Sequence, residues 1–212
     1  MRVIFTLFDE CGIIINMNAQ VELDRLIENC KSEGRTPSLL LHACCAPCAS
    51  YPLEYLVEHF DITLFYYNPN ITEQAEYQKR LNELMRLAHE FGVNVIDGGY
   101  TENLFFSATK GLEQEPERGS RCSVCFELRL KETAKQASNK FDYFATTLTL
   151  SPLKNAPLLN EIGQRVAKEC NATYLPTDFK KKGGYLRSIE LSQKYDLYRQ
   201  NYCGCVFSKR KD

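Results

Sequence analysis

Short apolar runs alternate along this chain with longer segments that are apolar on one side only. An apolar run between turn signals is typical of a buried strand, and such runs predict strands at 38–42, 61–67, 93–96, 142–149 and 172–175. Apolar residues at helical spacing predict helices at 21–32, 50–59, 73–91, 121–137 and 157–170. Strands that alternate with helices indicate an α/β fold, with a parallel Rossmann-like sheet and helices on both faces.

The two ends of the chain differ from this pattern. Residues 1–19 carry little periodicity and are interpreted as an N-terminal extension, whereas 20–212 suit a single α/β metalloenzyme domain with a basic, partly helical C-terminal segment. Asp9 and Glu10 interrupt the apolar start, so a secretory signal is not expected. No apolar run is long enough to span a bilayer, and we expect a cytoplasmic protein with no membrane partner.

Charge is distributed unevenly along the chain. Residues 180–212 hold nine basic and three acidic residues, a net charge of +6. Because the whole chain carries −1, the remainder carries −7. A basic segment on an acidic body predicts that a polyanion binds at the C-terminal segment.

Ten cysteines without a secretion signal indicate metal or redox chemistry rather than a disulfide scaffold. Seven of them form three groups: Cys44-Cys45-x-x-Cys48, Cys122-x-x-Cys125 and Cys203-x-Cys205. Two C-x-x-C pairs can complete a four-sulfur shell around zinc or a [4Fe–4S] cluster, and spacing does not decide between these metals. The surplus thiols favour a second metal or a redox dithiol over a closed zinc site. The first group follows a strand, and sites in parallel sheets form at the carboxyl ends of strands.

Five motifs in fixed order resemble those of the QueH-type, cobalamin-independent epoxyqueuosine reductases, from about residue 20 to the end of the chain. They are LHACCAPC at 41–48, YYNPNI at 66–71, RCxxCFxxRL at 121–130, TLTxSPxKN at 147–155 and YRQNYCGC at 198–205.

The resemblance implies reductive removal of the epoxide oxygen of epoxyqueuosine at the tRNA wobble position, giving queuosine. It also implies a fold similar to the adenine-nucleotide α-hydrolases (PP-loop/HUP), a [4Fe–4S] cluster, an additional mononuclear iron, an external electron donor and a redox-active disulfide. The resemblance implies chemistry without cobalamin. ATP is not expected either, because 42–48 (HACCAPC) replaces the glycine-rich phosphate loop of the PP-loop enzymes.

Residue roles follow from the same resemblance. Cys45, Cys48, Cys122 and Cys125 are the expected cluster ligands, and Cys44, Cys203 and Cys205 are candidates for the second metal. Cys203 and Cys205 are also expected to act in catalysis. Tyr67, His42 and Tyr202 are candidate proton donors. The candidate substrate contacts are Asn68 and Asn70 for the modified base, Lys154 for a phosphate or the developing oxyanion, and Lys180, Arg199 and Tyr202 for the RNA.

Two other functions remain open from the residues. A zinc-stabilised RNA-binding module would use the same C-x-x-C pairs without catalysis. A PP-loop-like tRNA thiolase would use cluster cysteines, although the missing phosphate loop argues against it.

Overall fold

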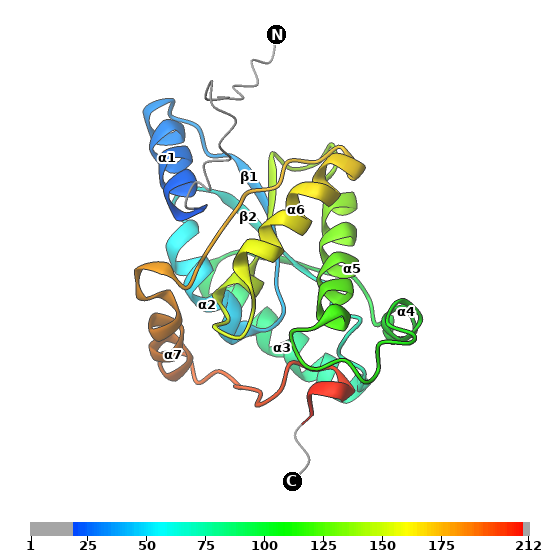
Figure 1. Ribbon diagram of the computed structural model, residues 1–212. Helices are drawn as coiled ribbons and strands as arrows, with labels where there is room; N and C mark the ends of the chain where they lie inside the picture. The colour runs from blue at the N-terminus through cyan, green and yellow to red at the C-terminus, as the bar shows by residue number, and fades with distance from the viewer. Residues whose placement is uncertain (1–18, 210–212) are drawn as a thin grey trace.

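The computed structural model describes residues 19–209 and centres on one four-stranded parallel sheet (Figure 1). The strands are β1 (Ser38–His42), β2 (Asp61–Tyr66), β3 (Asn94–Asp97) and β4 (Tyr143–Thr146), in the order β3-β2-β1-β4. All three strand pairings are parallel, as the alternating pattern predicts. The predicted N-terminal extension lies outside the described residues, apart from Ala19, which opens the first helix.

Seven α-helices and three short 3-10 helices accompany the strands in the described part of the chain. The α-helices are α1 (Ala19–Ser32), α2 (Ala46–Leu56), α3 (Gln74–Phe91), α4 (Glu102–Ala108), α5 (Ser120–Ala137), α6 (Ala156–Cys170) and α7 (Gly184–Lys194). The 3-10 helices are η1 (Thr147–Leu150), η2 (Lys181–Gly183) and η3 (Val206–Ser208). α2 begins earlier than expected, because Pro47 in its first turn is preset for helix and needs no hydrogen-bond partner for its nitrogen.

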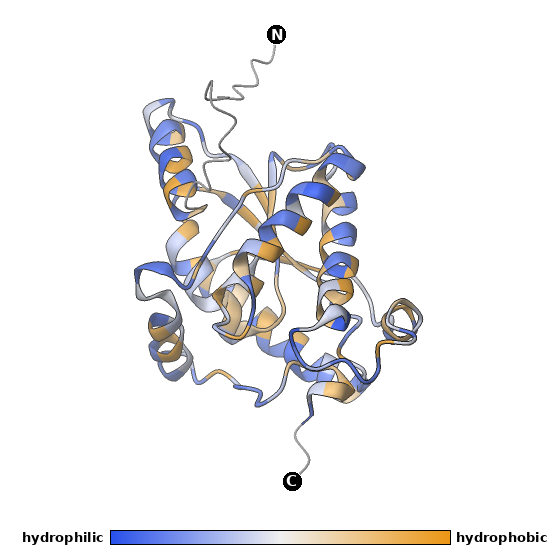
Figure 2. Ribbon diagram, in the orientation of Figure 1, coloured by the Kyte–Doolittle hydropathy of each residue, from blue (hydrophilic) through white to orange (hydrophobic). Residues whose placement is uncertain are grey.

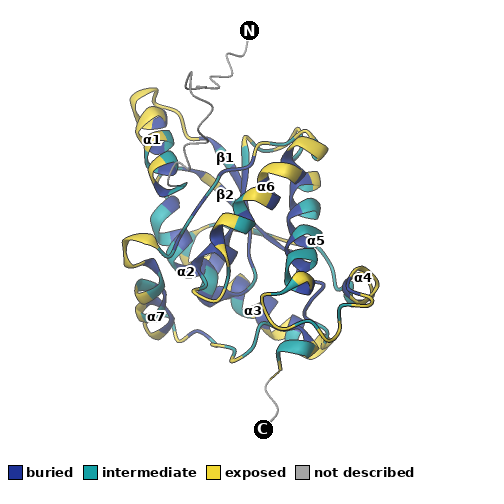
Figure 3. Cartoon of the chain, in the orientation of Figure 1, coloured by how far each residue is buried: buried dark blue, intermediate teal, exposed yellow. Residues whose placement is uncertain are grey.

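Helices cover both faces of the sheet. Alternate side chains of β1 enter two different hydrophobic clusters: Leu39 and Leu41 pack with residues of α1, α2 and α3, and Leu40 packs with residues of α5 and α6. The helices turn their hydrophobic sides toward the strands and their polar sides outward (Figure 2), and the strands are largely buried (Figure 3). The two-sided cover explains why β1 reads as a continuous apolar run.

Two strand predictions were wrong in part. The fourth strand ends at Thr146, whose hydroxyl accepts a hydrogen bond from the Leu148 backbone and starts η1. The predicted fifth strand at 172–175 is reduced to a single bridge between Phe144 and Tyr174. A local hydroxyl hydrogen bond therefore ends β4, and residues 172–175 meet the sheet through backbone bonds to Phe144.

The strand order creates a switch point at the carboxyl end of β1. From β1 the chain moves to β2 and β3 on one side, and it later returns to β4 on the other. The loops after β1 and β4 diverge there, which is where ligands bind in such sheets. The segment after α7 crosses this end of the molecule, past α3 and below α5 (Figure 1). Within residues 19–209, none of the helices has the length and hydropathy required to cross a membrane.

Candidate metal and substrate site

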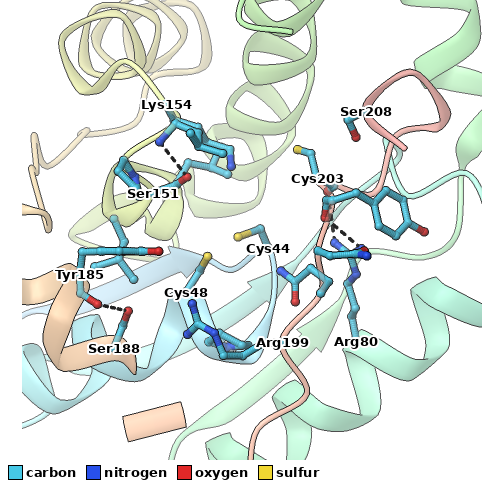
Figure 4. A pocket seen from close by; sticks show the side chains of 18 of the residues that line it. Cys44, Cys48, Arg80, Ser151, Lys154, Tyr185, Ser188, Arg199, Cys203 and Ser208 are labelled. Atoms are coloured by element: carbon cyan, nitrogen blue, oxygen red, sulfur yellow. Dashed lines mark hydrogen bonds between the residues drawn. The ribbon is translucent and has the colours of Figure 1, made fainter. Parts of the chain in front are cut away.

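A cavity of about 240 Å³ opens at the switch point (Figure 4). Its walls come from the start of α2, from α3, α5 and α7, from the loop after η1 and from the C-terminal segment. The predicted site residues that line it are Cys44, Cys48, Lys154, Arg199, Tyr202 and Cys203.

Three cysteines crowd together where β1 gives way to α2. The Sγ atoms of Cys44, Cys45 and Cys48 all lie within 4.8 Å of one another. Cys45 precedes the first turn of α2 and Cys48 lies within that turn, so the helix start gathers the thiols. The Gln200 amide donates to Cys45 Sγ over 2.8 Å and so closes the group from the C-terminal segment.

The pKa values of the three thiols are shifted in opposite directions. Hydrogen bonds from Cys45 and Cys48 hold the pKa of Cys44 well below its ordinary value. In turn, the interaction with Cys44 raises the pKa of Cys45 to about 12 and also raises that of Cys48. One thiolate supported by two thiols is a donor set prepared to exchange its remaining protons for a metal ion.

A second group contains the other four predicted metal cysteines. Cys122 and Cys125 lie in the first turns of α5, and burial is the main cause that raises the pKa of both, to about 12 for Cys125. Negative charge on Cys203 and Cys205 raises the pKa of both thiols further. Cys205 packs with Cys125 and Phe105, whereas Cys203 points into the cavity (Figure 4).

The redox-active disulfide that the resemblance implied is absent from the described part of the chain. All nine cysteines there are free thiols: Cys30, Cys44, Cys45, Cys48, Cys122, Cys125, Cys170, Cys203 and Cys205. The thiols of the site are therefore all available as ligands.

Two cations, Arg129 and Lys154, line the cavity with the cysteines. Arg129 is 1% exposed, and its Nη2 donates to Asn68 Oδ1 over 2.6 Å. Burial alone would lower the pKa of Arg129, but negative charge on Cys125, Cys44 and Cys203 raises it. The pKa of Lys154 is likewise lowered by burial and raised more strongly by Cys203, Cys44 and Cys48. Both side chains therefore remain charged beside the thiols.

Arg129 belongs to the motif at 121–130, but no role for it was predicted from the sequence. The available signal was its spacing: it follows Cys125 by one helical turn on α5 and so lies on the same face. Its Nε is buried without a hydrogen-bond partner among the described residues. A buried guanidinium whose counter-charges are thiols indicates a site built to hold negative charge.

Asn68 and Asn70 donate hydrogen bonds to backbone carbonyls and are not among the residues that line the cavity. Asn68 is fully buried and donates to the Ala43 carbonyl over 3.0 Å, directly before the first cysteine group. Asn70 donates to the Cys203 carbonyl over 3.4 Å. Each amide thus holds a loop that carries cysteines predicted to bind metal.

His42 and Tyr67 also lie behind the cavity wall. The Thr146 hydroxyl lies 2.9 Å from His42 Nδ1, and Nε2 donates to the Tyr67 carbonyl over 3.2 Å. Burial, with the Arg129 charge, lowers the pKa of His42 to about 3, so the ring is neutral at physiological pH. The Tyr67 ring stacks on Phe65 with ring centroids 5.9 Å apart. These contacts suit residues that join β1, β2 and β4.

Carboxylates of the body neutralise much of the basic segment. Lys180 donates to the Thr149 carbonyl and pairs with Asp178, each over 3.0 Å. Lys182 pairs with Asp24 over 2.8 Å. Arg199 is exposed at the cavity instead, with the Ser192 hydroxyl as its recorded partner. Burial raises the pKa of Tyr202, which also lines the cavity.

The donor set indicates which metals the site can hold. The three gathered ligands at the start of α2 are all cysteines, and thiolates select iron–sulfur clusters, zinc and other soft ions over magnesium or calcium. The residues therefore fit the iron–sulfur cluster and iron that the resemblance implies, although thiolate chemistry alone also admits zinc.

Comparisons with known proteins agree on one family. The family model described as "Epoxyqueuosine reductase QueH" matches residues 39–211. Proteins of that name are 42% identical over 207 residues in Streptococcus pyogenes serotype M1, covering 92% of this chain and 81% of the relative, and 43% identical over 204 residues in Staphylococcus epidermidis, covering 92% and 86%. The relative from Thermotoga maritima is 37% identical over 176 residues, covering 81% and 90%.

A solved structure shares the fold at low sequence identity. The U34-tRNA thiolase NcsA from Methanococcus maripaludis, solved with its [4Fe-4S] cluster, aligns with a TM-score of 0.52 and 14% identity over 90% of this chain and 69% of its own. The likeness supports the sheet and its helical cover, since identity this low carries fold alone.

Proposed function

This chain belongs to the epoxyqueuosine reductase QueH family, and from that membership we propose an oxidoreductase that removes the epoxide oxygen of epoxyqueuosine at the tRNA wobble position. The observation that carries the proposal is the three-thiol group of Cys44, Cys45 and Cys48 at the carboxyl end of β1, beside a cavity that Cys203, Arg129 and Lys154 also line. We place the reaction in the cytoplasm, with an external electron donor and without ATP or cobalamin.

Removal of the epoxide oxygen sets clear chemical requirements. Both carbon–oxygen bonds break, an alkene forms, and the oxygen leaves as water after taking up two protons and two electrons. The site must therefore accept electrons, stabilise negative charge on the leaving oxygen and deliver protons to it. When bound at the thiols, iron and its sulfide cluster supply the electrons one at a time.

We propose a division of the thiols that differs from the one expected from sequence. Cys122, Cys125, Cys203 and Cys205 offer the four thiolates that a [4Fe–4S] cluster requires. Cys122 and Cys125 share the start of α5, and Cys205 packs with Cys125, which supports one shared shell. Cys44, Cys45 and Cys48 offer three, which suits a single iron with an open position toward the cavity. The sequence-based division instead joined Cys45 and Cys48 to the α5 pair.

Lys154 and Tyr202 take the charge and proton roles in this proposal. Lys154 lines the cavity, and negative charge on Cys44, Cys48 and Cys203 favours its charged form. Its ammonium can therefore stabilise negative charge on the leaving oxygen. The Tyr202 hydroxyl is a proton donor on the same wall. His42 and Tyr67 are proposed to hold the strand ends in place behind them.

The anticodon loop is proposed to bind over the cavity mouth rather than along Lys180–Lys182. Arg199→Ala is expected to weaken tRNA binding and to lower the slope of log Kd against log salt by about 0.7, the value for one lost phosphate contact to a single strand. Lys182→Ala should leave both unchanged, since its ammonium is paired with Asp24. Fluorescence titration at several salt concentrations measures this, and equal effects of the two variants would contradict the proposed orientation.

Reduction of the substrate itself is the direct test of the function. Protein purified without oxygen and reconstituted with iron and sulfide is expected to convert epoxyqueuosine to queuosine in tRNA with a chemical reductant, without ATP or cobalamin. Nucleoside analysis by mass spectrometry measures the product. Iron-loaded protein that binds the tRNA but yields no queuosine would refute the function. Zinc without acid-labile sulfide in the purified protein would favour the RNA-binding module.

A further inference from the structure

The C-terminal segment that carries Cys203 lies along one polar face of α3. The residues that contact it, on α3 and at Glu73 directly before it, recur at helical spacing, so they form a single stripe. The contacts are Lys209 with Glu73, Tyr198 hydroxyl with Glu76, Tyr198 backbone with Glu83, and the Tyr195 and Asp196 carbonyls with Arg86. Polar contacts, rather than hydrophobic packing alone, therefore hold the C-terminal segment in place at the cavity.

Arg80 occupies the middle of that stripe and is the buried member. It is 2% exposed, and its Nε donates to Glu76 Oε1 over 2.7 Å. Its other two nitrogens reach the segment itself: Nη1 donates to the Cys203 carbonyl over 3.2 Å and Nη2 to the Tyr202 carbonyl over 3.4 Å. The guanidinium also lies 5.1 Å from the centre of the Tyr202 ring. Figure 4 shows Arg80 extending to the backbone at Cys203.

The backbone beside Cys203 fits tightly onto Arg80. Gly204 has a φ of 111°, a conformation that favours glycine. A Cβ atom there would lie 2.8 Å from Ile71 Cγ1 and 3.2 Å from Arg80 Nη1. Asn70 donates to the same Cys203 carbonyl. The position of Cys203 is therefore set by contacts to its carbonyl and its neighbour.

We propose that Arg80, oriented by Glu76, is a positioning residue that fixes Cys203 and Tyr202 toward the cavity. The inference rests on the proposed function, because both residues line the proposed reaction site. A planar guanidinium can bond one carboxylate and two carbonyls at once, whereas a lysine ammonium is a single point charge that cannot span them. Arg80 also lines the cavity, but its hydrogen bonds go to Glu76 and to these two carbonyls, so its assigned action is through the backbone of the segment.

Arg80→Lys keeps the charge beside Glu76 and removes the two-carbonyl contact. We expect kcat to fall about 10- to 100-fold, since a shift of about 1 Å at a reacting group can cost that much. KM for tRNA should change by less than about threefold, because Arg199 is held by Ser192 of α7. In metal-free protein, Cys203 should be alkylated by iodoacetamide about tenfold faster, measured by peptide mass spectrometry relative to Cys170.

Arg86→Lys is the matched control. Arg86 also donates to two carbonyls of the segment but lies away from the cysteines. The kcat and the Cys203 alkylation rate of the Arg86→Lys variant should therefore equal those of the wild type. Wild-type values for Arg80→Lys in either measurement would overturn the inference. If Arg80→Lys does not fold, Glu76→Gln gives the same two readouts. Lack of turnover in the wild type refutes the proposed function instead, and the alkylation rates then decide the inference alone.

Discussion

Cys122→Ser and Cys48→Ser are expected to abolish epoxide reduction while losing different metals. Cys122→Ser should lose acid-labile sulfide and most of the iron, because it removes one of four thiolates from the proposed cluster shell. Cys48→Ser should keep the sulfide and lose about one iron per chain, since it breaks the three-thiol group. Each loss of turnover should exceed the ~10- to 100-fold typical of changes around a metal site.

Iron and sulfide assays on anaerobically purified protein, with turnover on the substrate tRNA, measure this division. Cys170→Ser is the control, because this free cysteine ends α6 and lies outside both groups. Its metal content and turnover should match the wild type. Loss of sulfide from Cys48→Ser with retention in Cys122→Ser would reverse the assignment, and loss from both would support the single shell of Cys45, Cys48, Cys122 and Cys125 that the sequence suggested.

Lys154→Met is expected to lower kcat about 100- to 1000-fold, the usual effect of removing one group that stabilises a developing oxyanion. The substitution keeps the side-chain length and removes the charge, so the KM for tRNA should change little. Single-turnover assays on metal-loaded protein separate this effect from product release.

The pH dependence gives a second reading of Lys154. The thiols nearby raise its pKa above the ordinary lysine value, so its ammonium persists as pH rises to about 10. Wild-type turnover should therefore show no loss from this group between about pH 7 and 9. Lys131→Met, which removes an exposed lysine paired with Glu169, is the control and should retain wild-type kcat. Equal losses in the two variants, or a Lys154→Met enzyme of normal kcat, would refute the assigned role.

Local sequence patterns were sufficient to predict the fold class and the chemistry of the donor set. The apolar run at 39–41 could be read directly as part of a buried strand, because helices cover both of its faces and make each of its three leucines a core residue. The cysteine spacing was equally local: Cys45 and Cys48 share the start of α2, and Cys122 and Cys125 share that of α5. The five ordered motifs identified the family that the comparisons confirm.

Only the tertiary structure decided how these parts combine. The pairing of Lys180 and Lys182 with Asp178 and Asp24 depends on which surfaces meet, so the net charge of a segment does not predict which cations stay free. The same holds for Arg80 and Arg129, which read as ordinary helix-surface arginines until packing buries them. Arg80 donates to two backbone carbonyls of the C-terminal segment, and Arg129 donates to Asn68 after β2. Spacing fixes what lies within one helical turn, whereas burial and long-range contact arise only when the sheet brings its carboxyl ends together.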